Sequence, residues 1–537
     1  MRLKVLCIPS GLTNPRRKST PCELTILMTR LVSLPFFFLL VSSALADPQI
    51  GDLHLDDVHL DIVPRTEEEA ARIKRVTELP TEFDKPQKFE AKSAGAATVR
   101  ARRNKDAFSQ SSANIGYDGE LRFKVGNGLF KKLWVSSPSS TKASDGLGPI
   151  YNARSCQRCH IKDGRGHPPE SAEDSAVSMF LRISIPGEHH PLQDEIPGYH
   201  ATFPDPTYGT QMQDFGIPGH PAEYRLKIDY EEIKVALNGG ETASLRKPTY
   251  TAADLGYGPL HSGAMLSPRV APQMIGLGLI EAIPAKDILA GADPDDADGD
   301  GISGRPNIVW STEFDQPMLG RFGLKAGAPT VKHQSAGAFA GDIGISNSLN
   351  PFPWGECTEA QTDCRLAPHG DGDEREFEID DTGLDLVAFY SRNLAVPARR
   401  DVGDPEVLKG KELFYDIGCV ACHKPNYVTH RLKDQPAQSF QLIWPYSDLL
   451  LHDMGEGLAD NRPEARASGT EWRTAPLWGV GMTKQVSGHT YFLHDGRARS
   501  LLEAVLWHGG EAETHKQSVV ALDPEDRAAL IRFLESL

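Results

Sequence analysis

The sequence predicts a mainly α-helical protein with two similar units, the first of which carries a large irregular insertion. Three observations support this fold class. The pattern CxxCH occurs twice, at residues 156–160 and 419–423. A Gly-x3-Phe step precedes each copy, and an amphipathic stretch with helical periodicity closes each unit, at residues 384–394 and 527–537. The same order of parts around both copies indicates two units of one kind.

The CxxCH pattern is typical of covalent attachment of a c-type haem. Its two thiols form thioethers with the vinyl groups, and the adjacent imidazole ligates the iron on the proximal face. A redox-active CxxC pair and half of a zinc site are the alternatives, but a zinc ribbon needs two CxxC pairs close together, and these lie 263 residues apart. The sequence therefore predicts two covalently bound haem c groups. The attachment residues and proximal ligands are Cys156, Cys159 and His160 for the first haem and Cys419, Cys422 and His423 for the second.

The first unit begins near Phe108. Phe130 and Trp134 follow Gly126 at helical spacing, and a loop rich in Ser, Gly and Pro then leads to the first CxxCH. More than two hundred residues separate this motif from the stretch that closes the unit. We therefore expect a large insertion, rich in Pro and Gly, within the first unit.

The second unit is more compact. Asp404 can cap a helix whose first residue is Pro405, and Gly410 and Phe414 fall on one face of that helix. A helix, CxxCH, an irregular haem-wrapping section and a terminal helix that packs on the first helix form the layout of a class I cytochrome c domain. The sequence thus predicts two such domains, at residues 107–396 and 404–537.

Residues 1–46 are predicted to be a signal peptide. An apolar run at residues 31–41, too short to span a bilayer, precedes a small-residue cleavage site that ends at Ala46. Met28 directly precedes this run, so we expect translation to start there and residues 1–27 to be a spurious extension; an unusually long basic leader is the alternative. Because haem c is attached outside the cytoplasm, we predict a periplasmic protein without a transmembrane segment. Residues 47–106 lack periodicity and are predicted to be an extended or disordered arm.

The chain is strongly acidic, with a formal net charge of −16. Removal of residues 1–46 takes away six Lys and Arg residues and one Glu, which leaves 51 basic and 72 acidic residues and a net charge of −21. Such a surface argues against nucleic acid or an anionic membrane as partner. It is compatible with a basic electron-transfer protein.

Two further features concern cysteines and acidic residues. Cys357 and Cys364, which remain after the leader and the haems are accounted for, are predicted to form a structural disulfide; two free thiols or a dithiol site are the alternative. Asp296, Asp298 and Asp300 alternate before a glycine, as oxygen ligands do in calcium loops. No Glu stands at the twelfth position of an EF-hand, so a calcium site and a solvated acidic turn both remain open.

Several stretches resemble one family of enzymes. These are residues 138–149, 152–156, 320–325, 447–455 and 494–497. They resemble the di-haem c-type oxidoreductases labelled thiol oxidoreductases, which are relatives of bacterial di-haem cytochrome c peroxidases and of MauG-type enzymes. The resemblance covers residues 108–537. It implies an N-terminal haem where peroxide or another oxidant binds and a C-terminal haem that relays electrons.

The distal ligands are less well defined than the proximal ones. In the relatives the distal ligand of the second haem lies about fourteen residues after a His-x-Gly step, which here favours His508 and leaves Met454 as the second candidate. For the first haem, four residues of the insertion are unranked candidates, and the iron can equally lack a protein ligand: His261, Met265, Met274 and His333. Residues expected near the haem propionates or between the haems are His452, His494, Asp495 and Arg497.

The function predicted from the sequence is that of an exported di-haem oxidoreductase. Electrons from a small redox protein would enter at the second haem and pass to the first, where peroxide or a small-molecule substrate reacts. A pure electron carrier with two six-coordinate irons is one alternative. A haem-bearing accessory protein in iron handling is another.

Overall fold

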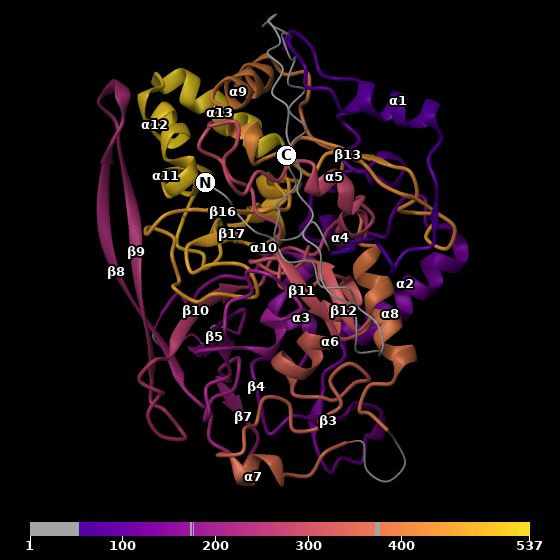
Figure 1. The fold of residues 1–537 in the computed structure, drawn as a ribbon, viewed down its shortest axis with the longest axis vertical. Coiled ribbons are helices and arrows are strands. Elements are labelled where there is room, and N and C mark those ends of the chain that lie inside the picture. Colours follow the sequence, from indigo (N-terminus) through magenta and orange to yellow (C-terminus); the bar gives the residue numbers. More distant parts are fainter. Residues whose placement is uncertain (1–52, 172–173, 175–176, 371–375) are drawn as a thin grey trace, which may run out of the picture. The chain divides into compact units, whose positions relative to one another are not determined.

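The computed structural model describes residues 53–537, apart from residues 172–173, 175–176 and 371–375 (Figure 1). The predicted signal peptide and its cleavage site lie outside the described residues. Within the described part of the chain, no helix is long and apolar enough to cross a membrane.

Two pairs of helices frame the two CxxCH motifs. Helix α2 (Gly116–Lys131) packs against α8 (Asp381–Arg392), and α9 (Pro405–Asp416) packs against α13 (Pro524–Ser536) (Figure 1). The Asp404 side chain accepts a hydrogen bond from the backbone N–H of Glu406 and so caps α9, as the sequence predicts. In each pair, the helix before the motif meets the helix that closes the unit.

Glycines allow both helix pairs to pack closely. A Cβ atom on Gly126 would lie 2.2 Å from the carbonyl oxygen of Leu386 on α8. A Cβ atom on Gly410 would lie 1.9 Å from the carbonyl oxygen of Ala529 on α13. No larger residue fits at either position without a backbone shift, which is the structural reason for the repeated Gly-x3-Phe step.

The prediction of a mainly α-helical fold is wrong, because the insertion is not irregular. Strands β8 (Arg225–Ala236) and β9 (Thr242–Ala253) form a long antiparallel hairpin, and β10 (Met265–Val270), β5 (Met179–Pro186) and β6 (Thr202–Phe203) form a three-stranded sheet (Figure 1). Apolar and polar residues alternate along much of β8, which is the period of a strand. The many Pro and Gly residues between the strands hid this pattern.

The remaining elements are short. The other α-helices are α1 (Glu67–Thr77), α3 (Cys156–Cys159), α4 (Leu277–Glu281), α5 (Ala285–Leu289), α6 (Val331–Ala338), α7 (Thr362–Arg365), α10 (Thr483–Ser487), α11 (Leu501–Leu506) and α12 (Glu513–Ala521). The other strands are β1 (Ile62–Val63), β2 (Val135–Ser136), β3 (Asp145–Leu147), β4 (Ile150–Tyr151), β7 (Phe215–Gly216), β11 (Ile308–Ser311), β12 (Gln316–Leu319), β13 (Tyr427–Val428), β14 (Arg431–Leu432), β15 (Leu442–Ile443), β16 (Leu451–Asp453) and β17 (Glu471–Arg473).

Residues 53–106 differ from the predicted extended arm. Helix α1 begins with a capping box, and β1 pairs with β14 of the second unit. Glu90 is buried, where its carboxylate contacts both Arg399 and Lys411. The stabilising partners lie more than three hundred residues away in the sequence, so local periodicity does not show that this stretch is ordered.

Each motif lies beside its own apolar cluster. Cys156 packs against a cluster that contains Phe130, Trp134 and Tyr390. Cys419 packs against a second cluster that contains Phe414 and Phe533. Aromatic side chains from the paired helices therefore form a wall next to the thiols of each motif.

Candidate functional site

The two CxxCH motifs fold into the same turn. The backbone N–H of His160 donates to the carbonyl oxygen of Cys156 at 3.0 Å, and that of His423 donates to Cys419 at 2.9 Å. The cysteines of both motifs are free thiols. One turn therefore presents two thiols and an imidazole together, first in α3 and then at the short 3-10 helix Cys419–Ala421.

Both proximal histidines are oriented by a backbone carbonyl. Nδ1 of His160 lies 2.7 Å from the carbonyl oxygen of Pro272, and Nδ1 of His423 lies 3.0 Å from that of Tyr446. A carbonyl can only accept, so Nδ1 carries the proton and the lone pair of Nε2 is available to a metal. Burial lowers the pKa of each imidazole to about 4, which keeps both rings neutral at neutral pH.

An aromatic side chain lies near the histidine of each motif, and the groups around both motifs are those that could hold a haem. The Phe130 ring lies 6.3 Å from the His160 ring, and the Phe414 ring lies 6.1 Å from the His423 ring, between centroids. Two thiols, one neutral imidazole and an apolar wall are the groups that a c-type haem requires. His160 and His423 would hold the two irons.

A second histidine faces His423. The ring centroids of His423 and His508 are 6.5 Å apart, and Nδ1 of His508 lies 2.8 Å from the carbonyl oxygen of Ala504. A metal–imidazole bond of about 2.0 Å, plus about 1.1 Å from nitrogen to ring centre, would separate the centres of two imidazoles bound to one iron from opposite sides by about 6.2 Å. His508 therefore has both the spacing and the free Nε2 of a distal ligand.

Met454, the other candidate, packs among apolar side chains. It contacts the cluster that contains Leu458, Trp472 and Trp507. The adjacent residue Trp507 lies on the same segment as His508. Met454 thus contributes to the apolar wall on the side of His508.

His452 cannot ligate iron, because both of its ring nitrogens have other partners. Nε2 lies 2.8 Å from Asp448 and Nδ1 lies 2.7 Å from Glu511. Burial alone would lower the pKa of this imidazole, but the two carboxylates raise it well above the usual value. Nδ1 also lies 3.5 Å from Sγ of Cys422. The ring is therefore an imidazolium beside Cys422 of the second motif.

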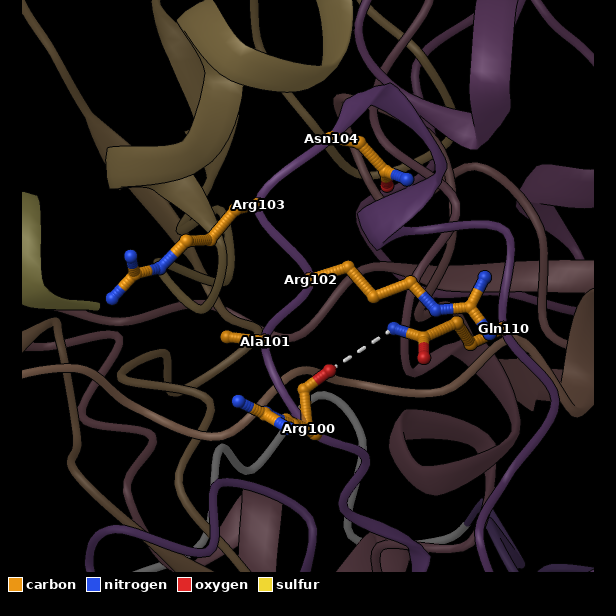
Figure 2. Close-up of a pocket in the computed structure, with 6 residues that line it drawn as sticks. All are labelled: Arg100, Ala101, Arg102, Arg103, Asn104 and Gln110. Carbon is orange, nitrogen blue, oxygen red and sulfur yellow. Dashed lines mark hydrogen bonds between the residues drawn. The ribbon is translucent and has the colours of Figure 1, made fainter.

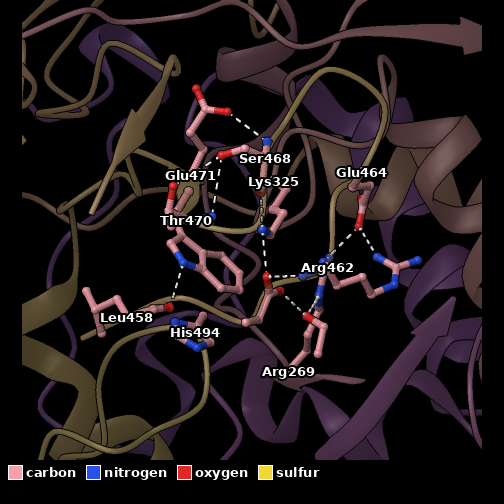
Figure 3. A network of polar contacts seen from close by, with 12 residues as sticks. Arg269, Lys325, Leu458, Arg462, Glu464, Ser468, Thr470, Glu471 and His494 are labelled. Carbon is pink, nitrogen blue, oxygen red and sulfur yellow. Dashed lines mark hydrogen bonds and ion pairs between the residues drawn. The ribbon is translucent and has the colours of Figure 1, made fainter. Parts of the chain in front are cut away.

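The other residues expected near the haems lie in a buried polar network. The His494 ring stacks on Trp472, with centroids 3.8 Å apart, and Figure 3 shows it beside ion pairs that involve Lys325, Arg269 and Glu464. Burial lowers the pKa of His494 to about 4. Its neighbour Asp495 accepts two hydrogen bonds, one from Oη of Tyr250 at 2.6 Å and one from Nε of Arg497 at 2.7 Å.

The four candidates near the first haem have different surroundings. His261 is exposed and Met265 pairs with Ser184 on the three-stranded sheet. Met274 packs against the apolar cluster that includes Cys156. His333 is neutral, because burial lowers the pKa of the imidazole. Among the described residues, neither the His261 ring nor the His333 ring makes a ring contact with His160, in contrast to His508 and His423.

Comparison with protein families decides the identity of the chain. Residues 88–537 match the family described as "Di-haem oxidoreductase, putative peroxidase". The chain belongs to this family. The protein is therefore an oxidoreductase with haem cofactors, in agreement with the resemblance of its motifs.

Other comparisons add little. No curated protein sequence matches this di-haem oxidoreductase. A structure of hydrazine synthase from Kuenenia stuttgartiensis overlaps 38% of the chain and 70% of its own, with 17% identity and a TM-score of 0.21. A TM-score this low indicates neither a shared fold nor a shared activity.

The sequence did not reveal a polar network beside the first motif of this di-haem oxidoreductase. The Asn152 amide donates to Asp214 at 2.9 Å, and the Gln211 amide donates to Asn152 at 2.6 Å and to Asp342 at 2.7 Å. Removal from water raises the pKa of Asp214 to about 8 and also raises that of Asp342. Both carboxyls act electrostatically on the thiol of Cys159. Scattered polar residues on loops give no sequence signal for such a network.

Two other predicted sites have a clear structural position. Cys357 and Cys364 are joined by a disulfide bond. In the acidic loop, Asp296 and Asp298 come together with Asp293, whereas the Asp300 carboxylate accepts a hydrogen bond from the backbone N–H of Ile302. In the structure Asp293, and not Asp300, lies together with Asp296 and Asp298. The calcium site stays a prediction.

Proposed function

We propose that this di-haem oxidoreductase is an exported c-type enzyme that passes electrons between a small redox protein and peroxide, or another small-molecule substrate, at its first haem. The observation that carries the proposal is the difference between the surroundings of the two motif histidines. His508 stands where a distal ligand of the second iron would be, and no comparable ring contact is made by His160 among the described residues. A haem with a vacant distal position can react with an oxidant, whereas a six-coordinate haem transfers electrons.

The thiols of both motifs would form thioethers with the haem vinyl groups, which supports export after synthesis. When bound, the haems supply the redox-active iron. The protein orients them through the Nδ1 hydrogen bonds of His160 and His423. These bonds fix the ring plane and leave Nε2 as the only ligand atom.

The network beside the first motif can hold a proton. Reduction of one peroxide molecule to water consumes two electrons and two protons. Oδ1 of Asp214 accepts from Asn152, so a proton on the carboxyl resides on Oδ2. Because its pKa is raised to about 8, Asp214 stays protonated at neutral pH and is a proton donor near the first haem.

One spectrum of the purified holoprotein tests this proposal. We expect one high-spin and one low-spin haem, with cyanide and CO binding only to the high-spin one, and reoxidation of the reduced protein by peroxide. Two low-spin haems that bind neither ligand in any redox state would instead identify an electron carrier and overturn the proposal. Extraction with acid and organic solvent should leave both haems on the polypeptide, with two porphyrin masses added.

A further inference from the structure

Cations surround the first motif although the chain as a whole is acidic, with a net charge of −16. The segment just before the first unit carries the exposed side chains of Arg100, Arg102 and Arg103. These three arginines line one pocket together with Gln110, which donates to the backbone oxygen of Arg100 (Figure 2). Exposed positive charge is therefore concentrated in one place.

This segment is held against the first motif. Nζ of Lys162, two residues after His160, lies 2.7 Å from the carboxylate of Asp106. Lys131, at the end of α2, also acts on the carboxylates of Asp106 and Asp163. We call the following group the first-haem patch: Arg100, Arg102, Arg103, Lys105, Lys131 and Lys162.

Two of the segments that carry these charges also carry exposed apolar side chains. Ile161, which directly follows His160, is 51% exposed. On α2, whose last residue is Lys131, Tyr117, Leu121 and Val125 repeat every four residues and are 85%, 58% and 48% exposed. An apolar surface with a charged rim is typical of transient protein interfaces.

The second motif lacks this surplus of positive charge. Asp416 before the motif is exposed, whereas Lys424 after the motif is half-buried. The Lys424 amine donates to the backbone oxygen of Asp287. The charged residues next to the second motif thus provide an exposed carboxylate and a half-buried amine, whereas the segments next to the first motif carry exposed cations.

We propose that the first-haem patch is the docking surface of a small redox protein whose own docking face is acidic. The proposal rests on the proposed function, in which the first motif holds a redox-active haem. Figure 2 shows that the side chains of Arg102 and Arg103 point to opposite sides of their segment. Spread charges match a protein face, whereas a small anion requires donors that converge on one point. The partner is thus the opposite of the basic protein that the total charge favours, and it meets the first haem rather than the second.

Charge reversal of two arginines tests this docking surface. We compare the holoprotein with R100E/R103E, using reduced plastocyanin, a small acidic copper protein, as the probe. Binding is measured by calorimetry, and electron transfer by stopped flow at several salt concentrations. We expect the second-order rate constant to fall about tenfold at low salt, the affinity to fall with it, and the salt dependence to disappear.

The matched control is K227E/K247E on the hairpin β8–β9, which changes the net charge by the same amount at exposed positions. It should stay within about twofold of the wild-type rate. Equal loss in both variants, or no loss in R100E/R103E, would overturn the proposal. So would faster electron transfer with basic mitochondrial cytochrome c than with plastocyanin.

Two further measurements are needed. The first distinguishes a protein-docking surface from a membrane-binding surface, and the second shows whether the docking proposal or the proposed function has failed. Flotation with phosphatidylglycerol vesicles that depends on Arg100 and Arg103 would show a membrane-binding surface and reject the protein partner. Peroxide reduction with a neutral hydroquinone donor should be unchanged in R100E/R103E. If that reaction is absent in the wild type while plastocyanin still binds through the arginines, the proposed function fails and the docking surface stands.

Discussion

The two CxxCH units share the local geometry of their motifs and differ in what lies around it. Both use the same turn, the same Nδ1 hydrogen bond and the same glycine at a helix crossing. They differ at the distal position, where His508 faces only the second motif. They also differ on the closing helix, which carries Tyr390 in the first unit and Phe533 in the second. Shared parts hold the cofactor, and the parts that differ determine the chemistry.

Removal of His508 has the largest expected effect, because it would make the two irons alike. In H508A the second haem should lose its distal ligand, become high-spin and bind CO, so the protein takes up two CO molecules instead of one. Optical and EPR spectra of the reduced and oxidised holoprotein measure this. M454L is the control and should keep the second haem low-spin; a high-spin M454L with an unchanged H508A would assign the ligand to Met454.

Replacement of Gly126 or Gly410 would disturb the close helix crossing that both units share. In G126A the new Cβ meets the backbone of α8, and we expect a loss of about 3 kcal/mol in the free energy of unfolding. G128A lies on the same helix with nothing within 4 Å of its Cβ and should stabilise the protein by up to about 1 kcal/mol. Urea unfolding of the holoproteins gives both values. Equal effects would mean that α2 and α8 do not cross closely at Gly126.

The pH dependence of stability reports on the first unit. The pKa of Asp214 is raised to about 8 in the folded chain, from 3.8. The folded protein keeps a proton that the unfolded chain releases, so this stabilisation is complete below about pH 4 and is lost as the pH rises towards 8, by up to about 1.4 kcal/mol per pH unit. Melting temperatures from pH 5 to 8 should fall less steeply in D214N.

The exposed residue Asp229 on β8 provides the matched control for Asp214. D229N should show the same pH slope as the wild type. A wild-type slope in D214N as well would mean that Asp214 releases its proton before neutral pH, and the first haem would then lack this proton donor.

The smallest effect concerns the aromatic residue on the closing helix. The hydroxyl of Tyr390 donates to Asp163 at 2.6 Å, whereas Phe533 has no hydroxyl at the corresponding place. Y390F should destabilise the protein by about 1–2 kcal/mol, because a buried carboxylate loses a donor. Thermal unfolding of the holoprotein measures this, and Y390F/D163N should recover part of the loss. An unchanged melting temperature in Y390F would show that the hydrogen bond contributes nothing.

Sequence patterns were reliable where the signal lies within a few neighbouring residues. The helix start at Asp404 and Pro405 and the helical stretch at residues 527–537 were predicted in this way. The strands of the insertion were missed because the many Pro and Gly residues between them hid the alternation. Residues 53–106 were misjudged because the residues that bury Glu90 are distant in the sequence.

The sequence by itself indicated the family and the positions of the two CxxCH motifs, because each motif contains the thiols and the imidazole within five residues, and one turn brings them together. Only the tertiary structure decided what stands opposite each imidazole. His423 and His508 are 85 residues apart, and the cations beside the first motif come from three separate segments. Such proximity depends on how the chain packs: the resemblance to relatives favoured His508 and left the first iron open, but only the structure shows how close the His508 ring lies to that of His423.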